Sequence, residues 1–479
     1  MKRLHPAGCL KPMPISPDSR LGLGLEKLDR NVFDPLPAFD LLSASGVRYV
    51  RLQSGWQRTE TKKGVYDFAW LDEILSSLVR RGMEPWLCLC YGHSAYSPSA
   101  AQYFGSVGVP PIFTSEEREA WAAYVRALVL HCRGRVRLYE IWNEPDGQWC
   151  WKHGVSAREY ARFAMSTADC IHAADPEARV AAGALCSIHL PYFRELLQEG
   201  LSTHIDALSF HRYQTHEHHV LEDIASLRAL LNRYPGRVDL IQGESGTQSE
   251  DCGAGALSGG AWTEVIQAKY LLRHRLLDLY SEVLFTSHFT TVDMVEALNG
   301  KTGDLKSRMD FGYFGVLHAD FNPEGFAEGT YTPKLSYFAL QYLCALFRGQ
   351  EKPCALPIRL AASDSPRVFA RDDDGPDVRI LGFSDPDGAW CAAWWKSCDL
   401  LRETYSGTIS LQLSGENRTL YLADLMTGNL FTLPDTMLGR QQGLLTELSH
   451  LPLLDSPLLL MTDDYLAKRQ EGFHCRSGV

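Results

Sequence analysis

The sequence lacks the features of a disulfide-framed, secreted or membrane-spanning protein. Its 13 cysteines are scattered, odd in number and include no C-x-x-C pair, which indicates free thiols in a reducing compartment. Residues 1–20 contain four prolines and no apolar stretch of signal-peptide length. No apolar run is long enough to span a bilayer. Together these absences predict a cytoplasmic protein.

Basic residues are too few for a nucleic-acid or anionic-membrane partner. The chain has 47 Lys and Arg against 58 Asp and Glu, a formal charge of −11, which disfavours both partners. With 45% hydrophobic and 22% charged residues, the composition is that of a globular protein. The 479 residues exceed one ordinary domain, so we expect a large domain and a smaller one.

Strand-like and helix-like patterns alternate as far as residue 347, with no hairpin signals between them. Eight such units in order predict a parallel sheet that closes into a (β/α)8 TIM barrel over residues 1–347. The rival is an open, doubly wound sheet, which usually has a Gly-rich loop after the first strand, whereas Gly22 and Gly24 lie within that strand. The expected strands are 20–25, 47–53, 85–91, 136–144, 180–185, 205–210, 238–244 and 283–289. The expected helices are 35–45, 70–81, 115–132, 156–173, 192–198, 220–234, 263–280 and 333–347.

The pattern changes after residue 350. Short apolar runs are separated by Asp, Gly, Pro and Asn clusters, and no segment has a convincing helical period. This arrangement predicts an antiparallel β-sandwich over residues 348–479. Its strands contain no cluster of catalytic residue types, so we expect this domain to brace the barrel or assist oligomerisation.

Two glutamates stand where a predicted strand enters a loop. Glu144 belongs to a W-N-E-P stretch in which Pro145 prevents the strand from continuing. Glu244 follows another apolar run and lies in G-E-S-G. Two carboxyls at the ends of two distant strands are what acid/base and nucleophilic chemistry on a glycosidic bond requires.

Other polar and aromatic residues stand at or near predicted strand ends, which meet at one mouth in a TIM barrel. Arg51 would keep Glu244 ionised, and Tyr213 could donate a hydrogen bond to it. Asn143 is suited to hold a sugar hydroxyl, and aromatic rings supply faces for sugars. The candidate substrate-binding residues are Arg51, His93, Asn143, Trp149, His211, Tyr213, His288 and Phe289.

Several of these candidates also have a purely structural interpretation. Arg51 could pair with an acid inside the barrel, a role that is compatible with keeping Glu244 ionised. His93 and His288 could be satisfied histidines under loops, and Trp149 could be loop packing. The H-E-H-H run at 216–219 is better explained by a solvated loop than by a metal site, because consecutive residues rarely share one ion. We expect neither a metal nor a cofactor.

The stretch E-I-W-N-E-P-D, with L-S-F-H-R-Y and I-Q-G-E-S, resembles the retaining glycoside hydrolases of clan A, and most closely family 39 (β-xylosidases and α-L-iduronidases), over about residues 19–347. The resemblance implies that Glu144 is the acid/base and Glu244 the nucleophile. It also implies that Asn143 binds the sugar 2-hydroxyl, while Arg51 and Tyr213 orient Glu244. The eighth strand departs from the clan, because many members place tryptophan where this chain reads L-F-T-S-H-F-T-T.

We therefore predict a retaining exo-glycosidase that acts on short oligosaccharides through a covalent glycosyl-enzyme. Three alternatives stay open. The first is an endo-acting enzyme of the same clan, and the second is a non-catalytic carbohydrate-binding barrel. The third is a metal-dependent hydrolase using His93, His211 and His288, which the absence of an H-x-H pair on the first strand disfavours. A glycoside is the expected partner, and association into a homo-oligomer is left open.

Overall fold

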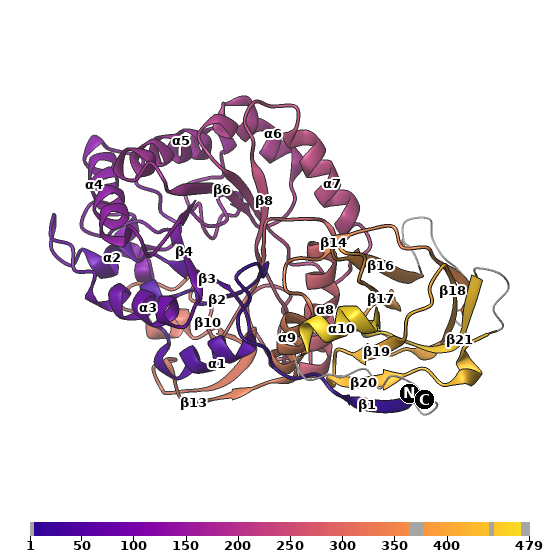
Figure 1. Ribbon diagram of the computed structural model, residues 1–479. Helices are drawn as coiled ribbons and strands as arrows, with labels where there is room; N and C mark the ends of the chain where they lie inside the picture. Colours follow the sequence, from indigo (N-terminus) through magenta and orange to yellow (C-terminus); the bar gives the residue numbers. More distant parts are fainter. Residues whose placement is uncertain (1–3, 364–376, 440–444, 471–479) are drawn as a thin grey trace.

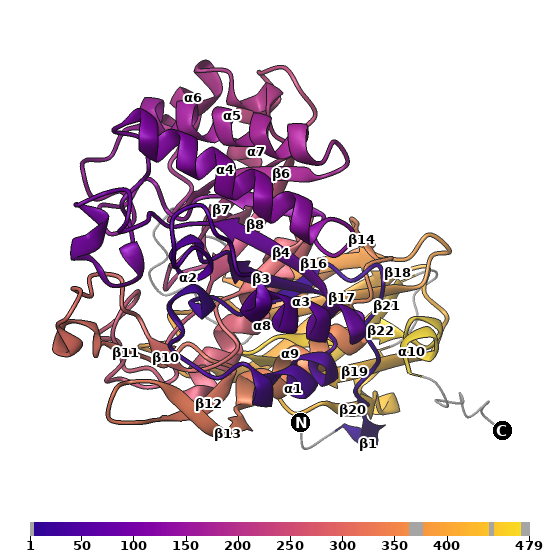
Figure 2. The same ribbon diagram turned by 90° about the vertical axis from the view of Figure 1, so that its left-hand side faces the viewer.

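The computed structural model describes residues 4–363, 377–439 and 445–470. Eight parallel strands close into a barrel in the order β2 to β9, as the alternating pattern predicts. In Figure 1 the helices α4 to α7 surround one side of this barrel, and Figure 2 shows α1, α3 and α4 on its outer face. The barrel strands are β2 (Leu21–Gly24), β3 (Tyr49–Gln53), β4 (Glu84–Leu89), β5 (Leu138–Ile141), β6 (Arg179–Leu185), β7 (Ala207–His211), β8 (Asp239–Ser245) and β9 (Thr286–His288).

A helix follows each of the eight barrel strands. Apolar residues recur at helical spacing in these helices, so that one face of the helix is buried against the strands. In α3 that face comprises Leu71, Ile74, Leu75 and Leu78. The eight helices are α1 (Phe39–Ser45), α3 (Ala69–Arg80), α4 (Ser115–Cys132), α5 (Ala157–Ala174), α6 (Leu190–Gln198), α7 (Val220–Leu231), α8 (Glu264–Tyr280) and α9 (Leu335–Leu346), and the single turn α2 (Trp56–Thr59) is additional. Within the described residues, no helix has the length and apolar character needed to cross a membrane.

The segment between β9 and α9 contains two antiparallel hairpins, so the expectation of no hairpins between the units is wrong here. One pairs β10 (Met294–Val295) with β11 (Phe311–Gly312), and the other pairs β12 (Leu317–Phe321) with β13 (Ala327–Pro333). The first two strands have only two residues each, too few for an alternating pattern. β13 reads A-E-G-T-Y-T-P, with four exposed positions, so it too lacks the buried alternation that marks a strand.

The C-terminal part is an antiparallel β-sandwich, as the sequence predicts. A seven-stranded sheet in the order β1-β20-β19-β22-β17-β16-β14 faces a three-stranded sheet, β15-β18-β21, and an apolar cluster that includes Trp394, Leu411 and Leu460 lies between them. The expectation of no helix is wrong for α10 (Asp463–Arg469). The strands are β1 (His5–Cys9), β14 (Lys352–Pro353), β15 (Ile358–Ser363), β16 (Val378–Ser384), β17 (Trp390–Lys396), β18 (Ser406–Ser414), β19 (Leu420–Asp424), β20 (Asn429–Thr432), β21 (Leu445–Leu454) and β22 (Leu458–Thr462).

The start of the chain lies in the sandwich, because β1 pairs with β20. The predicted domain boundary near residue 347 stays a proposal. In it we assign β1, which precedes the barrel in the chain, to the sandwich domain.

Buried polar contacts join the barrel to the sandwich. Arg273 on α8 donates two hydrogen bonds to the backbone carbonyl of Asp455, at 2.6 and 2.9 Å. Glu217, in the loop after β7, accepts a hydrogen bond from the indole of Trp395 and lies 3.4 Å from Arg273. The interpretation of 216–219 as a solvated loop is thus wrong for Glu217, which is buried between the two parts.

Candidate active site

The lower part of the barrel interior is an apolar plug. It consists of Trp86, Leu138, Ala181, Ala207, Ile241 and Phe285. The guanidinium of Arg51 lies over the Trp86 ring, 5.4 Å from its centroid. The polar site therefore begins one layer above the plug, towards the carboxyl ends of the strands.

Arg51 is fully buried at the centre of this polar layer. Its Nε and Nη2 donate to one carboxylate oxygen of Glu140 at 2.8 and 2.6 Å. Nη2 also donates to Asn143 Oδ1 at 2.8 Å, and Nη1 donates to Glu244 at 2.5 Å. Oε1 of Glu26 lies 3.7 Å from the same Nη1. Arg51 thus has both expected roles, as a partner of an acid inside the barrel and as a cation beside Glu244.

Glu244 lies near the end of β8, and both of its oxygens have donors. Arg51 contacts Oε2, and the Tyr213 hydroxyl donates to Oε1. Burial raises the pKa of this carboxyl, but the positive charges of His211 and Arg51 and the hydrogen bond from Tyr213 outweigh it. The net result is a pKa below the ordinary value, which keeps Glu244 ionised near neutral pH.

Glu144 follows β5 on a backbone with two left-handed residues, Trp142 (φ 69°) and Glu144 itself (φ 45°). Such conformations cost free energy in non-glycine residues and persist only where packing imposes them. Here the fully buried Trp142 indole is fixed by its donation to the Cys150 carbonyl at 2.7 Å.

The Glu144 carboxyl has two hydrogen-bond partners. His211 Nδ1 lies 3.0 Å from Oε1, and the Trp149 indole donates to Oε2 at 2.5 Å. Burial raises the pKa of Glu144, the charge of Glu244 adds to the rise, and the hydrogen bonds from His211 and Trp149 oppose it. The resulting pKa is above the ordinary value, so the two glutamates are shifted in opposite directions.

The two carboxyls converge on His211. One atom each of Glu144, His211 and Glu244 can be chosen so that all three lie within 4.8 Å of one another. Burial lowers the pKa of His211, but the charge of Glu244 and the hydrogen bond with Glu144 outweigh it, and the pKa lies above its ordinary value. His211 thus lies beneath two carboxyls that favour its protonated form, and it is fully buried rather than open to a ligand.

A cavity of about 540 Å³ opens over these groups, a size typical of small-molecule sites. Aromatic rings form much of its wall. Tyr213, Phe289 and Phe314 contact one another edge to face, with centroids 5.1–6.3 Å apart. The Trp149 ring lies against Gly147, where an added Cβ would come within 2.3 Å of it. The lining residues are Glu26, Lys27, Arg30, Gln53, Tyr91, Asn143, Glu144, Trp149, Cys186, Ser187, Tyr213, Glu244, Gly255, Ala256, Phe289, Glu296, Leu298, Asn299 and Phe314.

The structure does not bring His93 or His288 to this cavity. The His93 ring lies under a loop, with Nε2 2.7 Å from the Glu60 carbonyl and Nδ1 accepting from the Ala95 amide. His288 lies on the barrel strand β9, where side chains alternate in direction. Thr286, two residues earlier on the same face, hydrogen-bonds Asp278 of α8, so His288 faces the helix layer as well.

The positions of His93 and His288 disfavour the metal-dependent hydrolase that would use them together with His211. Within the ranges that the structure describes, His93, His211 and His288 do not form a group of possible metal ligands.

Five charged residues of the site were not predicted. Glu26 and Lys27 directly follow the predicted first strand, residues 20–25, so the strand-end argument that selected Arg51 could have found them. Glu140 lies within β5, and sequence offers no signal that it faces the barrel interior. Arg30 ends a short 3-10 helix, Leu28–Arg30, and Glu296 follows β10. Glu296 pairs with Lys27 at 3.0 Å, a contact between residues far apart in the chain.

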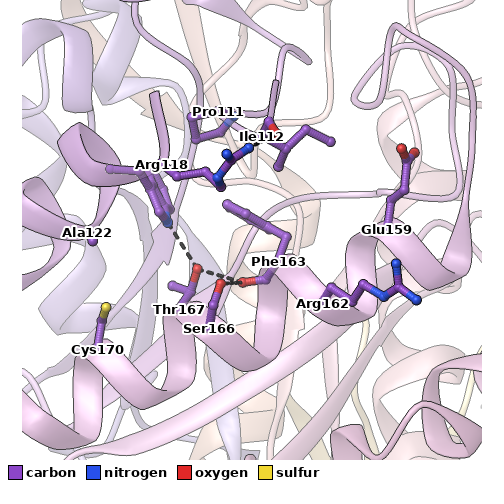
Figure 3. A pocket seen from close by; sticks show the side chains of 11 residues that line it. Pro111, Ile112, Arg118, Ala122, Glu159, Arg162, Phe163, Ser166, Thr167 and Cys170 are labelled. Atoms are coloured by element: carbon purple, nitrogen blue, oxygen red, sulfur yellow. Dashed lines mark hydrogen bonds between the residues drawn. The ribbon is translucent and has the colours of Figure 1, made fainter. Parts of the chain in front are cut away.

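A second hollow of similar size, about 550 Å³, lies between α4 and α5 on the outside of the barrel. Figure 3 shows its side chains, including Arg118, Phe163 and Thr167. The Trp121 indole donates to Thr167 at 3.0 Å, and Arg118 donates to the Ile112 carbonyl at 2.7 Å. These groups thus already have partners within the protein, and the residues that line the hollow include no pair of carboxyls that could act together.

Comparison with known proteins agrees with this geometry. The family model described as "Glycosyl hydrolases family 39" matches residues 43–233. The fold is similar to a family 39 glycoside hydrolase from Bacteroides cellulosilyticus WH2, with a TM-score of 0.64 and 16% identity over 93% of this chain and 81% of that one. It is also similar to a monomeric beta-xylosidase from Caulobacter crescentus CB15, with a TM-score of 0.58 and 17% identity over 95% and 97%.

Among curated proteins, beta-galactosidase BgaH from Haloferax lucentense is 40% identical over 48 residues, which is 10% of this chain and 7% of that protein. The family model confirms the predicted resemblance to family 39 over residues 43–233 and supports the prediction of a glycoside hydrolase. The similar structures, at 16% and 17% identity, confirm the fold.

Proposed function

We propose that this glycoside hydrolase is a retaining, exo-acting enzyme in which Glu244 is the nucleophile and Glu144 the acid/base. The observation on which the proposal rests is a pair of buried carboxyls, with oxygens within 4.8 Å, whose pKa values are shifted in opposite directions. Retaining enzymes place their carboxyls about 5–5.5 Å apart, whereas inverting enzymes leave about 6.5–9.5 Å for a water molecule. The short separation favours retention.

The reaction has two displacements. In the first, an oxygen of Glu244 attacks the anomeric carbon, the bond to the leaving oxygen breaks, and Glu144 gives its proton to that oxygen. In the second, water attacks the same carbon and passes a proton to Glu144, and the bond to Glu244 breaks. Arg51 and Tyr213 stabilise the carboxylate of Glu244 before attack and as it departs.

Asn143 receives a hydrogen bond from Arg51 and lines the cavity beside Glu144, so its amide is placed to bind a sugar hydroxyl next to the reacting carbon. Trp149 and Phe289 supply ring faces. We propose exo action on short substrates because loops after β5, β8 and β9 enclose the cavity, through Trp149, Ala256 and Leu298. The 12 cysteines in the described part of the chain are all free, which supports action in a reducing compartment such as the cytoplasm.

Aryl glycosides with different leaving groups test the assignment. We expect Glu144→Gln to retain activity on dinitrophenyl glycosides, which need no acid, and to lose roughly 10²–10⁴-fold on poor leaving groups. Glu244→Gln should lose activity on both. The panel should include β-xylosides and β-galactosides, after the printed activities of the similar proteins. Wild-type activity in Glu244→Gln, or a first product of inverted configuration by NMR, would refute the proposal.

A further inference from the structure

Glu26 is a third carboxyl in the site, and the reaction above does not use it. It follows β2 by two residues, is 1% exposed and lines the cavity. Its Oε2 accepts a hydrogen bond from Thr290 at 2.9 Å. Its Oε1 accepts none from any other described residue, and the nearest cation to it is Nη1 of Arg51 at 3.7 Å. A buried carboxyl oxygen without a donor is costly if it is charged and tolerable if the group holds a proton.

The fold provides a specific place for this carboxyl. It lies directly over Gly24, where an added Cβ would come within 2.0–2.3 Å of three of its atoms. Gly24 is an inward-facing residue of β2, paired with Arg51 of β3. Glycine at this position thus leaves room for the Glu26 carboxyl beside the arginine.

Glu26 and Glu244 share one nitrogen of Arg51, at 3.7 and 2.5 Å. The groups that face Glu26 are Arg51 from β3, Glu244 from β8 and Thr290 from the segment after β9; the adjacent Lys27 is paired with Glu296. Burial first, and the charge of Glu244 second, raise the pKa of Glu26 to about 7, while Arg51 opposes the rise. Removing the charge of Glu244 would therefore remove one of the two causes that keep Glu26 protonated.

The proposed reaction removes that charge once in each cycle, because the glycosyl-enzyme is an ester of Glu244. We propose that Glu26 is the alternate counter-ion of Arg51: it holds a proton while Glu244 is ionised and releases it when Glu244 becomes the ester. The proton passes to water through the cavity, and the Glu26 carboxylate then pairs with Arg51. When water cleaves the ester, Glu244 regains its charge and Glu26 takes a proton back, so charge and protons balance over the cycle.

This proposal rests on the double displacement proposed above, and it makes Glu26 a positioning residue. Its consequence falls on the second displacement, because an ionised Glu26 lowers the positive charge around the ester while the anomeric carbon again becomes cationic. A residue at position 26 that cannot ionise would leave Arg51 with one counter-ion fewer during the second displacement. The first displacement begins with Glu244 ionised and is less affected.

The test uses a 2-deoxy-2-fluoro glycoside with a dinitrophenyl leaving group, which slows release of the covalent intermediate. Proton release on trapping is measured with an indicator dye in weak buffer near pH 6. The wild type is expected to release up to one proton more than Glu26→Gln, and the excess should vanish well above pH 7. Glu60→Gln is the matched control, because Glu60 is a buried carboxyl that bonds to Trp56 and Tyr96 outside the cavity; it should release as the wild type does.

A kinetic readout accompanies the proton count. Glu26→Gln should slow reactivation of the trapped enzyme roughly tenfold, equivalent to about 1.4 kcal/mol in the barrier, and this loss should exceed the loss in kcat/KM on the activated substrate. Gly24→Ala, whose Cβ would displace the carboxyl, should slow reactivation likewise. If neither variant folds, the proton release of the wild type alone still tests the proposal, because it should fall by up to one proton between pH 6 and a pH well above 7.

Two failures are distinguishable. If mass spectrometry finds no sugar attached to the peptide that contains Glu244, the proposed function is wrong. If Glu244 is labelled but the wild type and Glu26→Gln release equal numbers of protons and reactivate equally fast, the role of Glu26 alone is overturned.

Discussion

Replacing Arg51 with methionine removes the only cation that contacts both Glu140 and Glu244 in the described structure. Methionine replaces the unbranched stem of arginine without its charged guanidinium, so the change removes the charge and its hydrogen bonds while apolar contacts along the stem are kept. Two effects should follow. The pKa of Glu244 should rise, and the buried carboxylate of Glu140 should lose the two hydrogen bonds it receives.

The size of both effects can be worked from the contacts. Two unit charges 4 Å apart interact by about 4 kcal/mol at an effective dielectric constant of 20, roughly three pKa units at 1.36 kcal/mol each. Arg51 is shared among several carboxyls and His211 stays in place, so we expect the pKa of Glu244 to rise by about 1–3 units. Leaving Glu140 without its partner should lower the free energy of unfolding by about 3–5 kcal/mol.

The assay is the pH dependence of kcat/KM on an activated aryl glycoside, together with denaturant unfolding. The acid limb reports the ionisation of Glu244 in the free enzyme, so in Arg51→Met it should move to higher pH. The double variant Arg51→Met/Glu140→Gln separates the two effects: stability should recover, because no unpaired charge remains on Glu140, while the acid limb stays shifted. An acid limb that coincides with that of the wild type in a folded Arg51→Met enzyme would refute the argument.

Further predictions concern the pH dependence, the loop beside the sandwich and metal ions. Because the folded pKa of Glu26 is raised from 4.5 to about 7, its contribution to stability is present below pH 4.5 and is lost as pH rises through 7; Glu26→Gln should flatten this decline, by up to about 3 kcal/mol, in thermal unfolding between pH 4.5 and 8. Trp149→Phe removes a hydrogen bond that lowers the pKa of Glu144, so the basic limb of kcat/KM should move to higher pH, and a shift to lower pH would contradict this. Glu217→Ala leaves Arg273 without its buried carboxylate and should cost about 3–5 kcal/mol in urea unfolding; a loss below 1 kcal/mol would show that the contact contributes little. Dialysis against a chelator should leave kcat/KM unchanged, because protein donors already bond to both oxygens of each catalytic glutamate, and loss of activity restored by a metal would refute this.

The barrel was predictable because its signals are local. Each strand is a short apolar run, and each helix repeats apolar residues at helical spacing, as Leu71, Ile74 and Leu78 do in α3. The hairpins between β9 and α9 were not predictable, because two-residue strands such as Met294–Val295 have no period of their own. Each of these strands forms by pairing with another short strand of the same segment, so the pairing defines the strand and no local period does.

The site was predictable to the extent that it depends on strand ends. Glu144, Glu244, Asn143 and Tyr213 line one cavity because parallel strands of a barrel end at one rim. His288 also ends a strand, yet it faces the helix layer. Side-chain direction alternates along a strand, and a one-residue difference in where a strand begins reverses it.

The amino-acid sequence by itself determined that this chain forms eight strand–helix units and places acids, an arginine and aromatic residues where strands meet loops. Those features depend on residues close in the chain. Only the tertiary structure decided that Glu26, Glu140 and Glu244 share Arg51, that Lys27 pairs with Glu296, and that Glu217 lies buried beside the sandwich. The physical reason is that pKa and charge pairing depend on distances of a few ångströms between segments brought together from distant parts of the chain, and no local pattern contains those distances.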